Sequence, residues 1–199
     1  MNRFAMKNQA WHNRQFQLIG TLPLIIFLYR LVQYLQVGTP DWIMYNCHVT
    51  MVLLSAGMVL GVPLLIRIAT IWLVIGLPMW LIDAYFIQEL WIASIFSHLG
   101  GFLLAIYAIH RVRATGQSWG PAVVWFLFWQ MITRYTTAPE LNINIAHAPY
   151  EFSQAWFASY WLFWPLCALG VSLLAWTAEC GLARVYPVAA PSPEKQQAW

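Results

Sequence analysis

Long apolar segments dominate this sequence and constrain its fold more than any other feature. A helix needs about 20 mainly apolar residues to cross the roughly 30 Å of hydrocarbon in a bilayer. Six segments of about that length follow one another along the 199 residues. We expect an all-α polytopic membrane protein with six transmembrane helices in one bundle. The expected spans are residues 16–35, 42–62, 64–82, 91–110, 119–137 and 155–177.

The amino-acid composition excludes most alternatives to a membrane protein. Charged residue types make up 9% of the chain and apolar types 61%, whereas a soluble domain carries roughly a quarter charged residues. So few charges cannot cover a water-facing surface, which excludes a soluble globule, a disordered chain and a nucleic-acid-binding protein. The 13 Trp, 9 Tyr and 11 Phe residues are typical of a chain with many bilayer interfaces, where aromatic side chains gather.

The sequence indicates a single domain with one distinctive loop. Residues 1–186 are expected to form the six-helix transmembrane domain, and the polar residues 187–199 a disordered C-terminal tail. Most connections between the expected helices are short. The exception, residues 137–154 with the sequence TAPELNINIAHAPYEFSQ, lies before the last span. It is a candidate functional segment, because long loops on compact bundles often carry function.

The basic residues favour one orientation in the membrane. If the N-terminus is cytoplasmic, 8 of the 10 basic residues fall on the cytoplasmic side, and only Arg30 and Arg134 fall on the outer side. The positive-inside rule therefore predicts that both termini are cytoplasmic, which an even number of spans also requires. The predicted location is a bacterial inner or plasma membrane, which the chain crosses several times.

Polar side chains from four of the expected helices fall into one layer of the membrane. With a rise of about 1.5 Å per residue, Cys47 lies roughly 8 Å and His98 roughly 10 Å from the outer surface. Arg30 and Arg134 lie within about two helical turns of that layer. Because ionisable groups in a bilayer usually face the protein interior or a wet cavity, we expect a polar site in the outer half. His48 follows Cys47 in the chain, and its direction is ambiguous.

Small residues predict that Cys47 and His98 face other helices. Helix contacts in lipid favour small side chains, and each of the two residues belongs to a helical stripe of mostly small residues. The stripes are Cys47, Thr50, Leu54, Gly57 and Gly61 on the second span, and Ser94, His98, Gly101, Ala105 and Ala108 on the fourth.

The residues of this layer point to nucleophilic chemistry. A thiolate is the reactive form of cysteine, and a neighbouring imidazole can take its proton, so Cys47 and His98 could hold an acyl group as a thioester. Arg30 and Arg134 could hold a phosphate head group, since guanidinium matches phosphate oxygens bidentately. Candidate donors to a developing oxyanion are Asn46, Asn142 and Asn144.

Three short motifs carry a resemblance to a known family. They are YNCHVTM at 45–51, FSHLGG at 96–101 and LNINIAH at 141–147. With these motifs the chain resembles the YwaF-like six-helix integral membrane proteins. Relatives of that family include phospholipid acyltransferases, which pair the Cys of an Asn-x-Cys-His type motif with a His two spans later, and androgen-induced hydrolases, which use a Thr. The resemblance implies a catalytic pair of Cys47 and His98, with Thr50 as the alternative nucleophile.

Three classes of function remain open at this point. The first is a Cys–His acyltransferase or lipid hydrolase that acts on membrane phospholipids and needs no cofactor or metal. The second is a membrane protein that binds haem or metal through His48, His98 and His147, since imidazole suits such ligands. The third is a non-catalytic subunit or assembly factor with a protein partner or a second copy in the membrane.

Several of these side chains also have a purely structural interpretation. Arg134 could pair with Asp83, Glu140 or Glu151, and Arg30 could extend to the outer head groups. His147 and Glu151 suit hydrogen bonds within the polar loop. The other two cysteines are expected to be inert, Cys167 as a packing residue and Cys180 as a reduced thiol on the cytoplasmic side.

Overall fold

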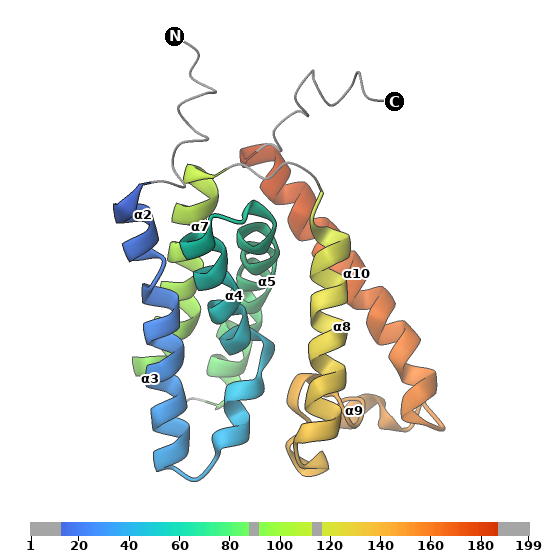
Figure 1. Ribbon diagram of the computed structural model, residues 1–199. Coiled ribbons are helices and arrows are strands. Elements are labelled where there is room, and N and C mark those ends of the chain that lie inside the picture. Colours follow the sequence, from blue (N-terminus) through green and yellow to red (C-terminus); the bar gives the residue numbers. More distant parts are fainter. Residues whose placement is uncertain (1–12, 88–91, 113–116, 187–199) are drawn as a thin grey trace.

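The chain folds into helices that run up and down beside one another (Figure 1). The computed structural model describes residues 13–87, 92–112 and 117–186, and this part contains helices and loops but no strand. The predicted all-α class is thus confirmed for the described residues. The longer helices are α3 (Leu22–Gln36), α4 (Asn46–Leu60), α5 (Pro63–Ile87), α7 (Gly101–Arg111), α8 (Trp119–Thr136) and α10 (Tyr160–Val185). The short elements are α2 (Arg14–Ile19), η2 (Pro40–Met44), α6 (Ile92–Ile95), η3 (Phe96–Gly100), η4 (Pro139–Leu141), η5 (Ile143–Ile145) and α9 (Glu151–Gln154).

Four helical segments of the described chain are long and apolar enough to cross a membrane. They are Arg14–Gln36, Pro63–Phe86, Ile92–Arg111 and Tyr160–Val185, and they correspond to the first, third, fourth and sixth expected spans. The other two expected spans do not reach that standard. Helix α4 is apolar but has only 15 residues, and the 18-residue α8 is not among the four. The structure is therefore that of a membrane protein with four clear candidate spans.

Helix boundaries differ from the expected ones where local residues end or delay a helix. The second span was expected to begin at residue 42, but residues 40–44 form the tight turn η2, and α4 begins only at Asn46. Tyr45 between them is extended, with φ −56° and ψ 138°. At the other end of the helix, Gly61 has φ +69°, a left-handed conformation that glycine adopts without steric penalty. Pro63 then opens α5, where its missing N–H costs nothing.

Helix α5 is the centre of the bundle and packs against α4, α7, α8 and α10. Its residues Ala69 and Ile71 are fully buried. The α4–α5 approach is close, since a Cβ on Gly57 would lie 2.8 Å from the backbone nitrogen of Ile66. A hydrogen bond also connects α5 to α8, since the indole Nε1–H of Trp72 donates to the carbonyl of Ala122 at 2.9 Å.

The two small-residue stripes face the interior as predicted. Thr50 and Leu54 on α4 are fully buried, and so are Ala105 and Ala108 on α7. Large apolar side chains instead cover the outer faces of α3 and α10, where Leu28 and Leu169 are examples of exposed residues. Such a surface is compatible with contact to lipid tails.

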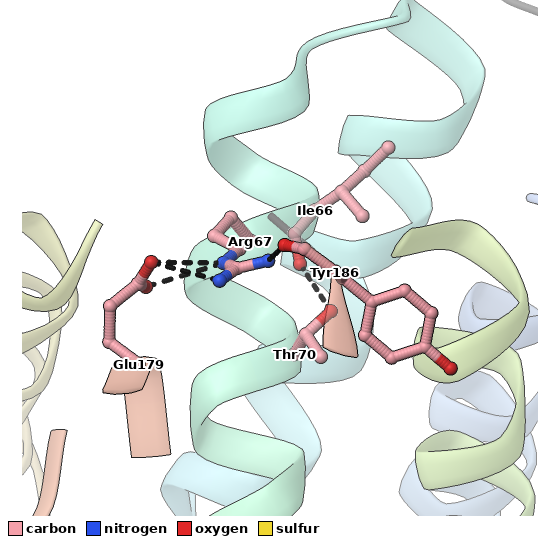
Figure 2. A network of polar contacts seen from close by, with 5 residues as sticks. All are labelled: Ile66, Arg67, Thr70, Glu179 and Tyr186. Atoms are coloured by element: carbon pink, nitrogen blue, oxygen red, sulfur yellow. Dashed lines mark hydrogen bonds and ion pairs between the residues drawn. The ribbon is translucent and has the colours of Figure 1, made fainter. Parts of the chain in front are cut away.

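A buried ion pair joins α5 to α10. Arg67 donates from Nη2 to Glu179 Oε1 at 2.9 Å and from Nε to the same carboxylate at 3.2 and 3.3 Å. Its Nη1 donates to the carbonyl of Tyr186, the residue that follows α10, at 3.1 Å. One guanidinium therefore binds α10 at Glu179 within the helix and again just after its end (Figure 2). Arg67 is one of the eight basic residues that the sequence places on the cytoplasmic side, and its pairing with Glu179 is a finding of the structure.

Candidate functional site

A chain of three polar side chains crosses from α3 to α4. Arg30 and Tyr34 lie one helical turn apart on α3, and the Arg30 Nη2 donates to the Tyr34 hydroxyl. The guanidinium carbon also lies 4.4 Å from the centre of the Tyr34 ring. On its other side, the Tyr34 hydroxyl is hydrogen-bonded to His48 Nε2 at 3.0 Å. His48 is therefore turned into the protein, which settles the direction that the sequence left ambiguous.

His98 completes this group from a third element. Its ring centre lies 6.2 Å from that of His48, and the Trp80 indole of α5 stacks on it at 5.0 Å with an interplanar angle of 8°. His98 belongs to η3, a π-helical turn between α6 and α7. Single π-turns in longer helices occur frequently at functional sites. We call Arg30, Tyr34, His48, Trp80 and His98 the histidine cluster.

Arg30, Tyr34 and His48 are the buried members of the histidine cluster, whereas Trp80 and His98 are half-buried. Arg30 is 6% exposed and His48 is 3% exposed. Within the part of the chain that the structure describes, neither Arg30 Nε nor His48 Nδ1 has a hydrogen-bond partner. Buried polar nitrogen atoms are nearly always hydrogen-bonded in proteins, so two unpaired ones in a single cluster are unusual.

Cys47 lies next to His48 at the start of α4, but it is not bonded to His98. The residue is half-buried and its thiol is free. No hydrogen bond joins Cys47 to His98 among the described residues. The predicted pairing of thiol and imidazole therefore stays a prediction. Thr50, the alternative nucleophile, is fully buried and donates to Asn46 Oδ1 at 3.4 Å.

The three asparagines predicted as oxyanion donors form hydrogen bonds in and beside the long loop, and their role as oxyanion donors stays a prediction. Asn144 accepts from the backbone N–H of Asn46 at 2.8 Å and donates to the carbonyl of Met44 at 2.9 Å. Asn46 Oδ1 accepts from Trp125 Nε1 at 3.2 Å. Asn142 Oδ1 accepts two backbone N–H groups inside the loop, those of His147 and Ala148, each at 3.0 Å. Asn144 thus fastens the loop to the residues that begin α4, directly beside Cys47, while Asn142 stabilises the loop itself.

Arg134 is bonded to the loop and to α10 rather than to the histidine cluster. Its Nη1 donates to the carbonyl of Ala146 at 2.6 Å. Its guanidinium carbon lies 4.2 Å from the ring centre of Tyr160 and 4.8 Å from that of Trp161. Among the side chains that the structure describes, the one ion pair is that of Arg67 and Glu179, so neither Asp83 nor Glu140 is the ionic partner of Arg134. The side chain of Glu151, the third expected partner, lies outside the described part.

The same loop carries His147 and a pocket on its surface. His147 is paired with Thr137, with Nε2 and Oγ1 3.5 Å apart, and it does not join His48 and His98. The described residues include no group of three or more His, Cys, Asp or Glu side chains that could hold a metal ion.

Tyr150 lies in the same loop. Burial raises the pKa of its phenol, and the charge of Asp83 raises this pKa further. An open pocket of about 590 Å³ is lined by Pro139, Glu140, Asn142, Ala148, Pro149, Tyr150 and Gln154.

Three residues of the site were not singled out from the sequence. Tyr34 had a detectable signal, since it lies one helical turn after a membrane arginine. Gln130 also had one, as a lone amide in WFLFWQM. It is fully buried, donates to the carbonyls of Asn144 and Ile145 at 3.1 and 3.2 Å, and accepts from Trp164 Nε1. Trp80 had no signal, because it is one of many aromatic residues.

Searches against protein-family models, curated proteins and solved structures found no match to this chain. What the site can do therefore follows from its own contacts. A buried guanidinium, a phenol and two imidazoles can bind an oxygen-bearing group and move a proton, and they lie beside a half-buried thiol.

Proposed function

We propose that this chain crosses the membrane six times, with α2–α3, α4, α5, α6–α7, α8 and α10 as the crossing segments and both termini in the cytoplasm. The start of α2 and the end of α10 lie at one end of the bundle (Figure 1), which supports an even number of crossings. Arg14, Arg111 and Arg184 lie at helix ends on that side. The positive-inside rule then makes it the cytoplasmic side, and the histidine cluster belongs to the outer half.

For the activity, we propose acyl transfer or ester hydrolysis on a lipid of the outer leaflet. The observation that carries this proposal is the contact between His48 and His98, two imidazoles that meet inside an apolar bundle next to Cys47. Ionisable side chains in membrane helices are rare and mark functional sites by default. The half-buried position of Cys47 suits a nucleophile that a lipid ester must reach.

The proposed reaction has two balanced steps. His98 takes the thiol proton of Cys47, and the thiolate attacks the carbonyl carbon of the lipid ester. The C–O bond breaks, the alcohol leaves with the proton from the imidazole, and a thioester remains on Cys47. A lysolipid hydroxyl or a water molecule then attacks the thioester and releases the Cys47 thiol. In this proposal His98 and Cys47 move closer together when the substrate binds, since catalytic hydrogen bonds are often long before the substrate binds.

An acyl-trapping experiment tests this activity. Purified protein is incubated with phosphatidylcholine that carries an isotope-labelled acyl chain, and the peptide that contains Cys47 is weighed by mass spectrometry. The proposal expects a mass increase of one acyl chain, which neutral hydroxylamine removes. Cys47→Ala must abolish the label and Cys167→Ala must leave it unchanged. An acyl adduct on Thr50, resistant to neutral hydroxylamine, would support the hydrolase type instead, and no adduct at either residue would overturn both.

A haem- or metal-binding protein is a second candidate, and the same contact between His48 and His98 favours it. Imidazole is a common haem-iron ligand, although His147 does not join the other two histidines in the described structure. The absorption spectrum of the purified protein tests it directly. A Soret band in the wild-type protein that is lost in both His48→Ala and His98→Ala would support haem. A wild-type protein with neither a Soret band nor bound metal would exclude this class. A partner protein that co-purifies with this chain, in a sample that shows neither an acyl adduct nor haem, would favour the non-catalytic subunit.

A further inference from the structure

Two nitrogen atoms of the histidine cluster lack the hydrogen-bond partner that a buried polar atom requires. Arg30 Nε and His48 Nδ1 are both buried, and no group in the described part of the chain pairs with either. Arg30 is also a cation without an acidic partner there, since the one ion pair joins Arg67 and Glu179. A buried charge that lacks a counter-charge is strongly unfavourable, so this pattern points to a negatively charged partner beyond the described residues.

The hydrogen bonds around Tyr34 determine what that something is. A guanidinium can only donate, so the Tyr34 oxygen accepts from Arg30 Nη2. The single Tyr34 proton is then available for His48 Nε2, which lies 3.0 Å away. A neutral imidazole that accepts at Nε2 carries its proton at Nδ1. With the Tyr34 proton donated to His48 Nε2, which is the arrangement that we propose, both unpaired nitrogens are N–H donors.

We propose that Arg30 and His48 bind the anionic head of a lipid, Arg30 through Nε–H and His48 through Nδ1–H. Two donors together with a net positive charge select an anionic oxygen over a neutral alcohol, because hydrogen bonds to charged groups are roughly twice as strong. Lipid phosphates and fatty-acid carboxylates share this chemistry. Tyr34 acts as a positioning residue, since it directs the His48 proton to Nδ1. The inference rests on the proposed function only in that the anion belongs to the lipid on which the site acts.

The position of the His48 proton is the first test. Imidazole nitrogen chemical shifts of ¹⁵N-histidine-labelled protein distinguish a protonated from an unprotonated nitrogen, and His48→Gln assigns the signals. We expect a protonated Nδ1 and an unprotonated Nε2 in the wild-type protein, and loss of this preference in Tyr34→Phe. Tyr29→Phe is the matched control, since Tyr29 lies on the same helix and is exposed. A protonated Nε2 with a free Nδ1 in the wild-type protein would overturn the proposal.

Binding of three matched probes is the second test, carried out in Cys47→Ala so that no acyl transfer can occur. Dodecanoate offers a carboxylate, dodecyl phosphate offers a phosphate, and dodecanol has the same chain without charge. We expect at least one anion to shift the His48 Nδ1 signal and to bind about tenfold or more weakly in Tyr34→Phe and in Arg30→Gln. The tighter of the two anions identifies the source of the oxygen.

The outcomes separate this inference from the proposed activity. Equal binding of dodecanol and both anions, or anion binding unchanged by Tyr34→Phe, would overturn the anion site. Anion binding in Cys47→Ala together with no acyl adduct in the wild-type protein would support the site and overturn the acyl transfer.

Discussion

Arg67 and Glu179 lie 112 residues apart in the sequence and share a buried two-pronged ion pair. Their side chains are 1% and 5% exposed. Helix α5 is the centre of the bundle, and this pair together with the bond from Arg67 to the Tyr186 carbonyl fixes α10 against it. The arrangement places the one ion pair of the described side chains at the end of the bundle opposite to the histidine cluster.

Removal of one partner of this pair should destabilise the protein strongly. Glu179→Leu leaves the Arg67 guanidinium buried without a counter-charge, and we expect a loss of about 3–5 kcal/mol in the free energy of unfolding. The double variant Arg67→Leu, Glu179→Leu leaves no unpaired charge and should recover most of that loss. Denaturant titration in detergent micelles measures both. A single variant as stable as the wild-type protein would show that the pair is not buried in the membrane protein.

The loop should depend on the side chain of Asn144 rather than on its backbone conformation. Asn144 has φ +57° and two hydrogen bonds to the start of α4. Asn144→Gly keeps the left-handed backbone accessible and removes both bonds, so a loss of about 1–3 kcal/mol in unfolding free energy is expected from the bonds alone. Asn144→Ala adds backbone strain and should be worse. If the glycine variant were as stable as wild type, the loop would not be fastened through this amide.

Arg134 should contribute through its shape as well as its charge. The Arg134 guanidinium, which contacts the rings of Tyr160 and Trp161, is planar, whereas an ammonium is a point charge. We therefore expect Arg134→Lys to lower the thermal midpoint, and Arg134→Leu to lower it further. Bound phospholipid measured in the same samples should not change. A fall in bound phospholipid in Arg134→Leu with no change in stability would restore the head-group role predicted from the sequence.

The orientation in the membrane can be tested with reporter fusions. Fusions after Ala114 and after Asn144 should report opposite sides of the membrane, with Ala114 in the cytoplasm, because most basic residues then lie inside. Fusion of the same reporter after Thr39 should agree with Asn144. Reports from one compartment for Ala114 and Asn144 would contradict the proposed topology.

Hydropathy and small-residue stripes were enough to predict the helices and their inward faces. The stripe through Thr50 and Leu54 is buried as expected, because lipid tails leave close packing as the main force between helices. Boundaries were less predictable, since they depend on local turns. Helix α10 continues to Val185 rather than ending at 177, and hydropathy alone did not register the Arg67–Glu179 pair that holds its last turns.

The ionisable members of the candidate site were predictable, but their pairings and their aromatic neighbours were not. His48, His98 and Arg30 were identified because ionisable residues are costly in a bilayer, and the structure brings them together. Spacing along one helix cannot show which residue of another helix a side chain meets. For that reason Tyr34 was missed, and the bonds of Asn144 to the start of α4 were not predicted.

The most direct test of the central claim is the rate at which Cys47 reacts with a lipid-soluble maleimide. A thiolate reacts and a thiol does not, so a histidine that takes the proton of Cys47 must accelerate its labelling. We predict that Cys47 is labelled much faster than Cys167, and that His98→Ala slows the labelling of Cys47 about tenfold or more while His147→Ala leaves it unchanged. Labelling of Cys47 no faster than that of Cys167, or equally fast without His98, would contradict the account.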